Sequence, residues 1–361
     1  AKDVKGSKSW IPLGGGFNLQ AAELCKIFVS LALAKFLSNR QIIVNQQFRL
    51  KLKDLIKNYK NTFYALFFIV LPLIIIKQLQ DETGLAVVMI AFVIVLYREG
   101  LSVNFLIFGL IATILFVIAL IITNIGGLLI TLAVISASAF LFVRRVKKNL
   151  IIVALVYASA AGVVLGTNYV YNHLEGHQKV RIDVLLGRGN VDLKKEGYNV
   201  NQAKIAIAGG SWLGKGPGNS TQRNFLPHSY SDFIYAIIIE EYGLIGGAII
   251  LGIYILFLFR CIRLYRKCPF AFGAFLALAL SFTLVIQAIA NMGVNVNLFP
   301  NTGVTLPLVS MGGSSFLFTC LSIGIILSVA RNVEQQEGLQ SLKAAEAGTA
   351  QTEEKQEEVD E

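Results

Sequence analysis

Apolar runs long enough to cross a membrane recur along the chain and constrain its fold more than any other feature. The longest run, 232–259, exceeds the about 20 residues that a helix needs to span a bilayer. Hydrophobic residues make up 55% of the chain and charged residues 15%, and the long runs rather than this average identify a membrane protein. The sequence therefore predicts an all-α fold, a polytopic transmembrane helical bundle.

About nine runs qualify as spans, and the loops between them carry the basic charge. Loop 38–60, the segment RRVKKN (144–149) and the end of the long run at 260–267 are rich in Lys and Arg. Cytoplasmic loops are enriched in these residues, so the three segments are predicted to face the cytoplasm. The net charge of +10 then reflects topology rather than nucleic-acid binding. The predicted spans are 17–37, 61–76, 85–97, about 101–122, 126–143, 149–170, 232–259, 270–290 and 314–330.

The predicted organisation is a transmembrane domain over residues 1–333 followed by a tail. Nine spans place Ala1 outside and Glu361, the cytoplasmic C-terminus, inside. Residues 171–231 form one large extracytoplasmic loop, in which 200–208 is apolar enough for an interfacial helix. Residues 334–361 are acidic and poor in apolar residues, which is typical of a disordered tail. The first residue is Ala1 rather than Met, and we expect the chain to be truncated at its N-terminus.

A second unusual segment, 291–313, is uncharged and rich in Gly, Pro and Asn. Irregular backbone at membrane depth is tolerated only where protein or a cavity surrounds it, so we expect a re-entrant segment that lines a site. Ser310, Gly312 and Gly313 lie in it, and the glycines allow close approach of the backbone.

The passage from loop to helix at 214–243 is where chemistry is expected. Ser231 and Asp232 precede an apolar run, as helix N-cap residues do. Glu240 lies eight residues after Asp232, hence about two turns deeper on the same helix face. Ionisable groups in membrane segments are functional candidates. The alternative is structural: Asp232 only caps a helix, and Glu240 only ties two helices together.

Other chemically capable residues are few. Glu23 and Lys26 share a face of the first predicted span, which predicts an internal ion pair or a polar cavity. The four cysteines form no CxxC pair, and the three histidines are scattered near the large loop. Neither a disulfide framework nor a metal site is therefore predicted from these residue types.

Three separated stretches together resemble one known family. They are KSWIPLGGGFNLQAAELCK (8–26), GYNVNQAKIAIAGGSWLGKGPGNSTQRNFLPHSYSDFIYAIIIEEYG (197–243) and FPNTGVTLPLVSMGGSS (299–315). They are similar to the SEDS family of shape, elongation, division and sporulation proteins, as is HQKVRI (177–182) at the entrance of the large loop. The resemblance extends over nearly the whole chain in the same order, and the middle motif is highly specific.

The resemblance implies a peptidoglycan glycosyltransferase that polymerises lipid II at the outer face of the bacterial cytoplasmic membrane. It further implies a class B penicillin-binding protein as partner, together with other division or elongation membrane proteins. The form of the middle motif favours the division branch of the family over the elongation branch. Family members usually have three more helices before the tryptophan loop, and many carry an arginine where this chain has Ser9. Asn224 replaces a glutamate found in some members, so no role for that acid is carried over.

By the same resemblance, the catalytic aspartate of the family corresponds to Asp232, which we expect to act as a general base. Trp10 is expected to stack on a sugar ring, with membrane anchoring as the alternative. Cationic groups would stabilise the leaving pyrophosphate. The candidates are Lys8, Lys179, Arg181, Lys215 and Arg223, with Arg181 and Lys215 favoured. No cofactor is predicted with certainty, and a divalent cation, Mg²⁺ or Mn²⁺, is left open because no acidic cluster marks its site.

Two other functions remain open on the sequence. A lipid II flippase or transporter would use Glu23, Lys26 and Glu240 as a polar path through the membrane. A scaffold of the division machinery would need no catalytic residue at all. The loop-to-helix motif at Asp232 favours the enzyme.

Overall fold

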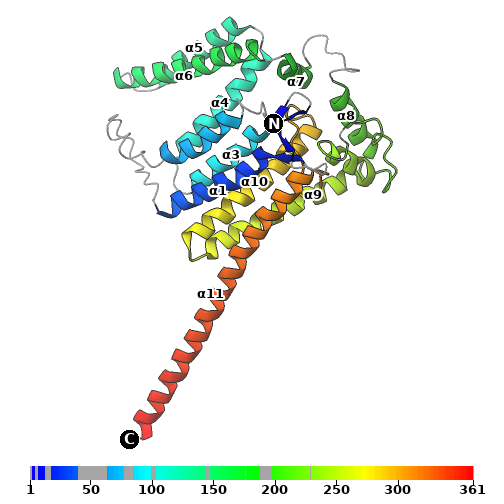
Figure 1. The fold of residues 1–361 in the computed structure, drawn as a ribbon. Helices are drawn as coiled ribbons and strands as arrows, with labels where there is room; N and C mark the ends of the chain where they lie inside the picture. The colour runs from blue at the N-terminus through cyan, green and yellow to red at the C-terminus, as the bar shows by residue number, and fades with distance from the viewer. Residues whose placement is uncertain are drawn as a thin grey trace. The chain divides into compact units, whose positions relative to one another are not determined.

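The computed structural model is helical through most of its length (Figure 1). It describes residues 2–4, 7–12, 18–39, 63–76, 84–98, 103–122, 124–142, 147–174, 176–187, 197–227 and 229–360. Each of the nine predicted spans falls on a helix. The basic loop predicted at 38–60 lies almost entirely outside the described residues.

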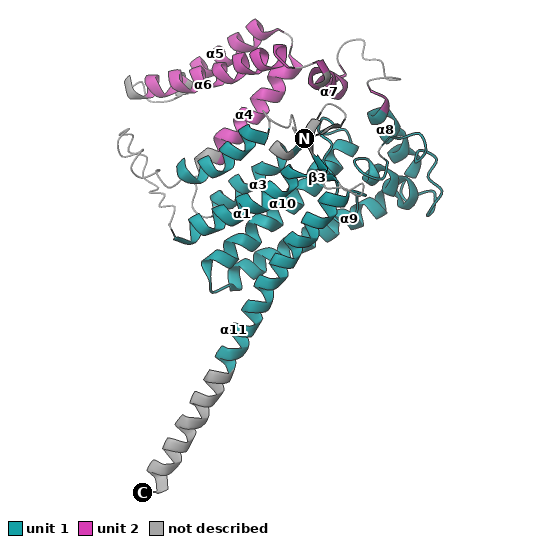
Figure 2. Ribbon diagram, in the orientation of Figure 1, with its two compact units in different colours: residues 1–100, 199–361 teal, residues 101–198 magenta. Residues whose placement is uncertain are grey.

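The chain divides into two compact units, coloured separately in Figure 2. Unit 1 combines Ala1–Gly100 with Asn199–Glu361, and unit 2 is Leu101–Tyr198. Unit 1 therefore holds all three of the longest family-like stretches but for two residues, 197 and 198, whereas unit 2 holds the short stretch 177–182. Each unit is described on its own.

Unit 2 is built on α6 (Lys147–Asn172), which packs against both α4 (Val103–Ile121) and α5 (Ile125–Phe142). The Asn124 side-chain oxygen accepts a hydrogen bond from Gly127 N at 2.9 Å, which caps the start of α5. A further helix, α7 (Gly176–Leu186), lies inside the large loop, where the sequence predicted none.

Unit 1 begins with a small antiparallel sheet, which the sequence did not predict. Its strands are β1 (Lys2–Val4), β2 (Ser7–Pro12) and β3 (Asn18–Gln20), in the order β1-β2-β3. Trp10 pairs with Gln20 in the β2–β3 register. The following helix, α1 (Ala21–Asn39), starts four residues later than predicted because residues 18–20 belong to the sheet.

Helix α10 (Ala271–Asn295) is the centre of unit 1. It packs against α1, α3 (Gly84–Arg98), α9 (Ile234–Lys267) and α11 (Gly313–Asp360). Small residues dominate its surface and let neighbouring helices approach closely, and most of its side chains are buried. A shorter apolar helix covers Phe63–Ile76, and α8 (Tyr198–Gly210) confirms the helix predicted at 200–208.

Helix α9 is not the continuous span that the sequence predicted. Gly243 adopts φ 72° and ψ −176°, which breaks the helix after its first turns. The helix also begins at Ile234 with Phe233 at the N-cap position. Hence neither Ser231 nor Asp232 occupies the N-cap position that the sequence predicted for them.

Among the described residues, four helices are long and apolar enough to cross a membrane: Asn149–Asn172, Ile234–Lys267, Ala271–Asn295 and Gly313–Ser341. Shorter apolar helices cover Phe63–Ile76, Val87–Tyr97, Leu106–Ile121 and Ile125–Ser138. The chain is an integral membrane protein with a polytopic helical fold. Its tail differs from the prediction, since α11 continues as helix through Asp360 in place of a disordered segment. Ala, Glu, Gln and Lys dominate this part, and all four are good helix formers.

Candidate active site

The backbone of Asp232 is fixed by two buried amide side chains of α10. Asn291 Nδ2 donates to the Asp232 carbonyl at 2.8 Å, and Asn295 Nδ2 donates to the same oxygen at 2.9 Å. Asn295 Oδ1 also accepts from Ala236 N at 3.0 Å, in the first turn of α9. Both carboxamides are at most 1% exposed. The segment that carries Asp232 is therefore held on α10 rather than by its own helix.

The loop between α10 and α11 supports the same segment from a second direction. Ser310 Oγ donates to the Ser231 carbonyl at 2.6 Å and accepts from Leu306 N at 2.7 Å. Met311 N donates to the Tyr230 carbonyl at 2.7 Å. The irregular segment is 296–312, shorter than the predicted 291–313, because 291–295 continue α10 and Gly313 begins α11. Ser310 reaches the residue next to Asp232.

The Asp232 carboxylate lies close to Gly303 of this loop. A methyl group placed on Gly303 would lie 3.8 Å from Asp232 Oδ2, and Gly303 has a φ of 70° that favours glycine. Asn291 Nδ2 also donates to the Val304 carbonyl at 2.7 Å. One carboxamide thus joins the backbone of Asp232 to the loop that passes beside its side chain.

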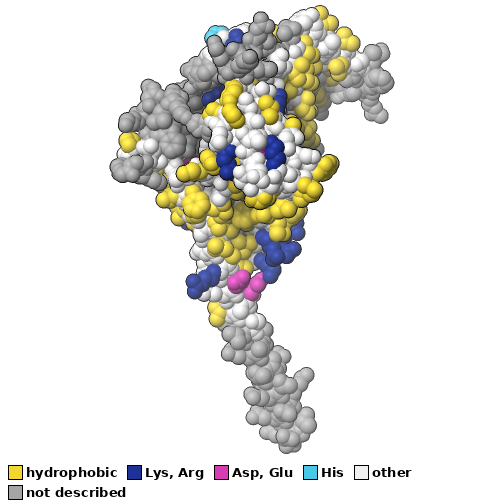
Figure 3. All heavy atoms as spheres, turned by 90° about the vertical axis from the view of Figure 1, so that its right-hand side faces the viewer, with side chains coloured by type: hydrophobic (Ala, Val, Ile, Leu, Met, Phe, Trp, Pro, Cys, Tyr) yellow, Lys and Arg dark blue, Asp and Glu magenta, His cyan; other side chains and the backbone are white. Residues whose placement is uncertain are grey.

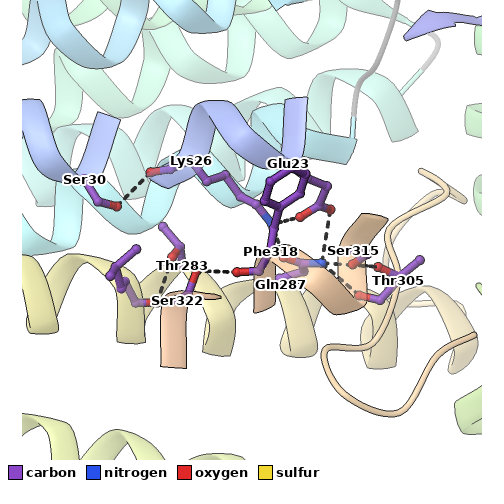
Figure 4. A network of polar contacts seen from close by, with 10 residues as sticks. Glu23, Lys26, Ser30, Thr283, Gln287, Thr305, Ser315, Phe318 and Ser322 are labelled. Atoms are coloured by element: carbon purple, nitrogen blue, oxygen red, sulfur yellow. Dashed lines mark hydrogen bonds and ion pairs between the residues drawn. The ribbon is translucent and has the colours of Figure 1, made fainter. Parts of the chain in front are cut away.

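A buried polar cluster lies one turn along α10 (Figure 4). Lys26 pairs with Glu23 on α1, and its Nζ donates to the side-chain oxygen Oε1 of Gln287 on α10. Gln287 Nε2 donates to Thr305 O at 3.2 Å and to Glu23 Oε1 at 3.5 Å. Thr305 Oγ1 lies 2.6 Å from Ser315 Oγ. We call these five residues the Gln287 cluster, and it confirms the ion pair predicted at positions 23 and 26.

Gln287, Asn291 and Asn295 are spaced by four residues and so form one line along α10. They connect α1, the loop after α10 and the start of α9. The sequence analysis missed this line, although three carboxamides at a period of four in an apolar helix are an available signal. Polar residues inside membrane helices normally face the bundle interior, and all three do so here.

Glu240 collects a second polar cluster. Its carboxylate accepts from Lys215 Nζ at 2.6 Å, Thr221 Oγ1 at 2.7 Å, Thr221 N at 3.1 Å and Gln222 N at 3.2 Å, and also from Ser220 Oγ. Glu240 is 0% exposed. We call these five residues the Glu240 cluster. Its partners all come from the loop before α9, and the helix that carries it is broken three residues later at Gly243, so the predicted continuous helix around Glu240 is wrong.

Glu241 anchors the same loop through Arg223, whose guanidinium donates to it. The Arg223 guanidinium also lies 5.7 Å from the centre of the Tyr230 ring. Lys215 and Arg223 were predicted to bind the pyrophosphate of a substrate. In the structure both cations are paired with glutamates, a use of their charge that the sequence analysis did not foresee.

The helix break at Gly243 is filled by loop backbone. Where an unbroken helix would bond Leu244 N to the Glu240 carbonyl, Leu244 N donates instead to Ser211 O at 3.0 Å. The Glu240 carbonyl accepts from Lys215 N at 2.9 Å. The same exchange joins Gly216 N to Glu241 O and Ile245 N to Trp212 O.

Glycines make this close crossing of backbones feasible. A methyl group on Gly214 would lie 2.2 Å from Glu241 O, one on Gly243 2.1 Å from Trp212 O, and one on Gly210 2.0 Å from Ile239 O. Such distances leave no room for a side chain. The contact predicts that these three positions tolerate glycine alone.

Of the other predicted site residues, some belong to unit 2 and some have side chains outside the described ones. Lys8 and Trp10 lie on β2, but their side chains are outside the described ones. Lys179 and Arg181 lie on α7 of unit 2, where Lys179 Nζ stands 4.8 Å from the centre of the Tyr171 ring. Gly313 begins α11.

Among the described residues, no group of three or more His, Cys, Asp or Glu side chains is placed to hold a metal ion. The described protein groups next to Asp232 are of three kinds. These are one carboxylate on a fixed backbone, a glycine beside it, and carboxamides behind it.

A sequence model of the FtsW/RodA/SpoVE family, described as cell cycle protein, matches residues 1–127 and 111–335. A probable peptidoglycan glycosyltransferase FtsW of Thioalkalivibrio sulfidiphilus is 31% identical over 332 residues, which cover 91% of this chain and 67% of the relative. A probable peptidoglycan glycosyltransferase FtsW of Pseudomonas fluorescens is 29% identical over 357 residues, covering 97% and 71%.

The fold is also similar to a solved one. A chain from a peptidoglycan synthase complex, studied for its coordination of polymerization and crosslinking, superposes with a TM-score of 0.61. The match covers 92% of this chain and 76% of that one at 24% sequence identity. At this identity the similarity supports the fold and nothing finer.

Proposed function

The chain belongs to the FtsW/RodA/SpoVE family of cell cycle proteins, and from this we propose that it is a peptidoglycan glycosyltransferase. Relatives that align with nearly the whole chain carry that activity in their names. The substrate of the proposed reaction is lipid II, and the product is a glycan strand. We place the reaction at the outer face of the bacterial cytoplasmic membrane, with the C-terminus in the cytoplasm, as the basic loops indicate.

The proposed step is the attack of a sugar 4-hydroxyl on an anomeric carbon that bears a lipid pyrophosphate. A carbon–oxygen bond forms between the two sugars, and the bond from the anomeric carbon to the pyrophosphate breaks. Asp232 takes the proton of the hydroxyl, and the electron pair leaves with the pyrophosphate. A positioned general base typically contributes about 10²–10⁴-fold to such a rate.

One observation supports this assignment above all others. The Asp232 carbonyl receives hydrogen bonds from both Asn291 and Asn295, and the carboxylate lies close to Gly303, which has no side chain. A backbone fixed in this way holds the carboxylate in one place, as a positioned general base requires.

The cationic groups now separate into two sets. Lys215 and Arg223 are paired with Glu240 and Glu241, so we assign them to holding the loop in place. Stabilising the pyrophosphate then falls, as a proposal, to Lys8, Lys179 and Arg181, with Trp10 against a sugar ring. We route no step through a metal ion.

A class B penicillin-binding protein is the proposed partner. The similar solved structure described above comes from a complex that coordinates polymerization and crosslinking. Other division membrane proteins would complete the assembly. The division branch of the family is favoured because both aligned relatives above are named FtsW.

The test is polymerisation of lipid II by the purified chain with its partner. We expect Asp232→Asn to lose at least about 10²-fold in polymer formed, the minimum for a general base. Glu334→Gln makes the same chemical change on an exposed part of α11 and should keep full activity. Equal thermal unfolding midpoints of the two variants would show that folding is not the cause.

The same variant separates the rival functions. A flippase predicts that lipid II is translocated equally well by Asp232→Asn and that no polymer forms with either chain. A scaffold predicts that Asp232→Ala still supports growth of cells that depend on the protein. Polymer from wild type and equal polymer from Asp232→Asn would refute the general-base assignment while leaving the enzyme.

A further inference from the structure

The turn that follows α8 presents two large apolar side chains to the outside. Trp212 is 70% exposed and its neighbour Leu213 is 80% exposed, which puts both among the most exposed large hydrophobic residues described, together with Met311 at 79%. They are adjacent and lie within a loop that is otherwise polar and glycine-rich. Neighbouring exposed apolar groups on a folded segment mark an interaction surface.

This turn is hydrogen-bonded to the backbone of α9 directly after Gly243. Leu244 N donates to Ser211 O at 3.0 Å, and Ile245 N lies 3.4 Å from Trp212 O. Ser211 itself adopts a positive φ of 49°, which reverses the chain just before the two exposed residues. The turn is thus fastened where α9 resumes after its break.

From that point α9 presents a continuous apolar face. Leu244 and Ile245 are 42% and 47% exposed, and further exposed apolar residues follow along the helix. This part of α9 lies in a helix long and apolar enough to cross a bilayer, so its exposed apolar side chains suit contact with lipid. The further residues are Ile249, Ile253, Leu256 and Phe259.

The composition of the turn fits the boundary between hydrocarbon and water. Tryptophan is enriched at membrane interfaces because its ring is apolar while its N–H remains hydrated. Lys215 follows two residues after Leu213, with its charge bound to Glu240. Figure 3 shows hydrophobic side chains next to Lys and Arg side chains on the face that carries this loop.

We propose that the Trp212–Leu213 turn inserts into the bilayer interface on the side of the large loop and is covered by lipid. Its continuity with the lipid-facing surface of α9 favours lipid over a protein partner. Because the turn is bonded to α9 at Leu244 and Ile245, insertion fixes the depth at which the preceding segment, with Asp232, meets the membrane. This inference depends on the membrane span alone and holds whether or not the chain is a glycosyltransferase.

The chain contains only two tryptophans, which makes the test direct. In the Trp10→Phe variant the fluorescence reports Trp212 alone. The 361-residue variant is reconstituted into phosphatidylcholine vesicles whose acyl chains carry bromine either near the headgroup or near the chain end. We expect strong quenching by the shallow bromines, weaker quenching by the deep ones, and little quenching by aqueous iodide.

A depth reference comes from the same helix. Ile253→Trp, in a background with Trp10 and Trp212 both changed to Phe, places a single tryptophan ten residues beyond Gly243, which is about 15 Å along a helix. Its fluorescence should be quenched more by the deep bromines than by the shallow ones. The two reporters should therefore respond in opposite order.

Leu213→Asp adds a charge to the turn. Leu213 is 80% exposed, so the change should not affect folding. We expect it to lower the quenching of Trp212 by shallow bromines by roughly twofold or more, since a charge is disfavoured in the interface. Strong iodide quenching of Trp212 without bromine quenching would overturn the proposal. The proposal would also be overturned if Trp212 were protected from iodide only at high protein-to-lipid ratios. Protection that is lost when more lipid is added would show that a second copy of the chain covers the turn. No readout requires enzymatic activity, so this test and the polymerisation test fail separately.

Discussion

The Gln287 cluster and the Glu240 cluster both bury carboxylates, but they neutralise them differently. In the first, the ion pair lies within one helix, between Glu23 and Lys26, and the neighbouring helix supplies a neutral carboxamide. In the second, the carboxylate of Glu240 on α9 is satisfied by a loop 18 to 25 residues earlier in the chain.

The difference teaches where charge can be used to join segments. Inside the helix bundle, the opposite charges lie on one helix and the neighbouring helix contributes a neutral partner, which limits the cost of removing charges from water. At the loop, charge itself crosses between segments, together with backbone N–H groups that need an acceptor. The first ion pair should be replaceable as a unit, whereas Glu240 should not.

The largest effect should come from removing Glu240. Glu240→Ala leaves Lys215 Nζ and the donors of Ser220, Thr221 and Gln222 without their buried acceptor. Breaking a buried, hydrogen-bonded ion pair costs about 3–5 kcal/mol, and we expect a loss of unfolding free energy of that size. The thermal unfolding midpoint in detergent measures it. An unchanged midpoint would show that the loop does not depend on this carboxylate.

A smaller but still large effect should follow from Lys26→Met. The change leaves Glu23 buried without its cation, and about 3 kcal/mol of unfolding free energy should be lost. Adding Glu23→Gln should restore most of that loss. By contrast, Glu240→Leu combined with Lys215→Met should restore little, because the loop N–H donors remain. Equal restoration in both double variants would remove the distinction between the clusters.

Gln287→Leu sharpens the role of the neutral bridge. The carboxamide is 0% exposed and bonds to Lys26, Glu23 and Thr305, so its loss should cost about 1–3 kcal/mol, as for hydrogen bonds to charged groups. Thr283→Val, one turn earlier on α10, is the matched control. Its hydroxyl donates only within its own helix, to Leu280 O at 2.7 Å, and its loss should cost less. A larger effect in the control would contradict the bridge.

The smallest effect should be at the exposed pair of Lys267 and Glu337, whose nitrogen and oxygen lie 3.1 Å apart. Both side chains are about half exposed, so Lys267→Ala should change the unfolding free energy by less than about 0.5 kcal/mol. The little that is lost should vanish at high salt, because exposed charges are screened. The dependence of the midpoint on salt concentration measures this.

The helical fold was predictable because apolar runs report membrane helices directly. The ion pair of Glu23 and Lys26 was also predictable, since a spacing of three residues places both on one helix face. The break at Gly243 was not, because nothing local distinguishes that glycine from Gly246 or Gly247. What breaks the helix is the backbone of a loop some 30 residues earlier, a contact that hydropathy does not encode.

The site could be predicted only in part for a similar reason. Asp232 stood out by its position at the start of an apolar run, whereas its supports on α10 are neutral amides more than fifty residues away. Lys215 and Arg223 looked like anion-binding groups because the sequence does not reveal that Glu240 and Glu241 are their partners. Charge in a loop indicates a ligand only after internal pairing has been considered.

The filled break in α9 has a consequence for biosynthesis. The ribosome makes residues 211–216 before 240–245, so the early segment waits for its acceptors to emerge. Until the two dock, the Glu240 and Glu241 carbonyls and the amides of Leu244 and Ile245 lack their final partners at the entrance to a hydrophobic span. Insertion of this span and closure of the loop must therefore be completed together, and a chain stalled between the two events would be an early substrate for quality-control proteases.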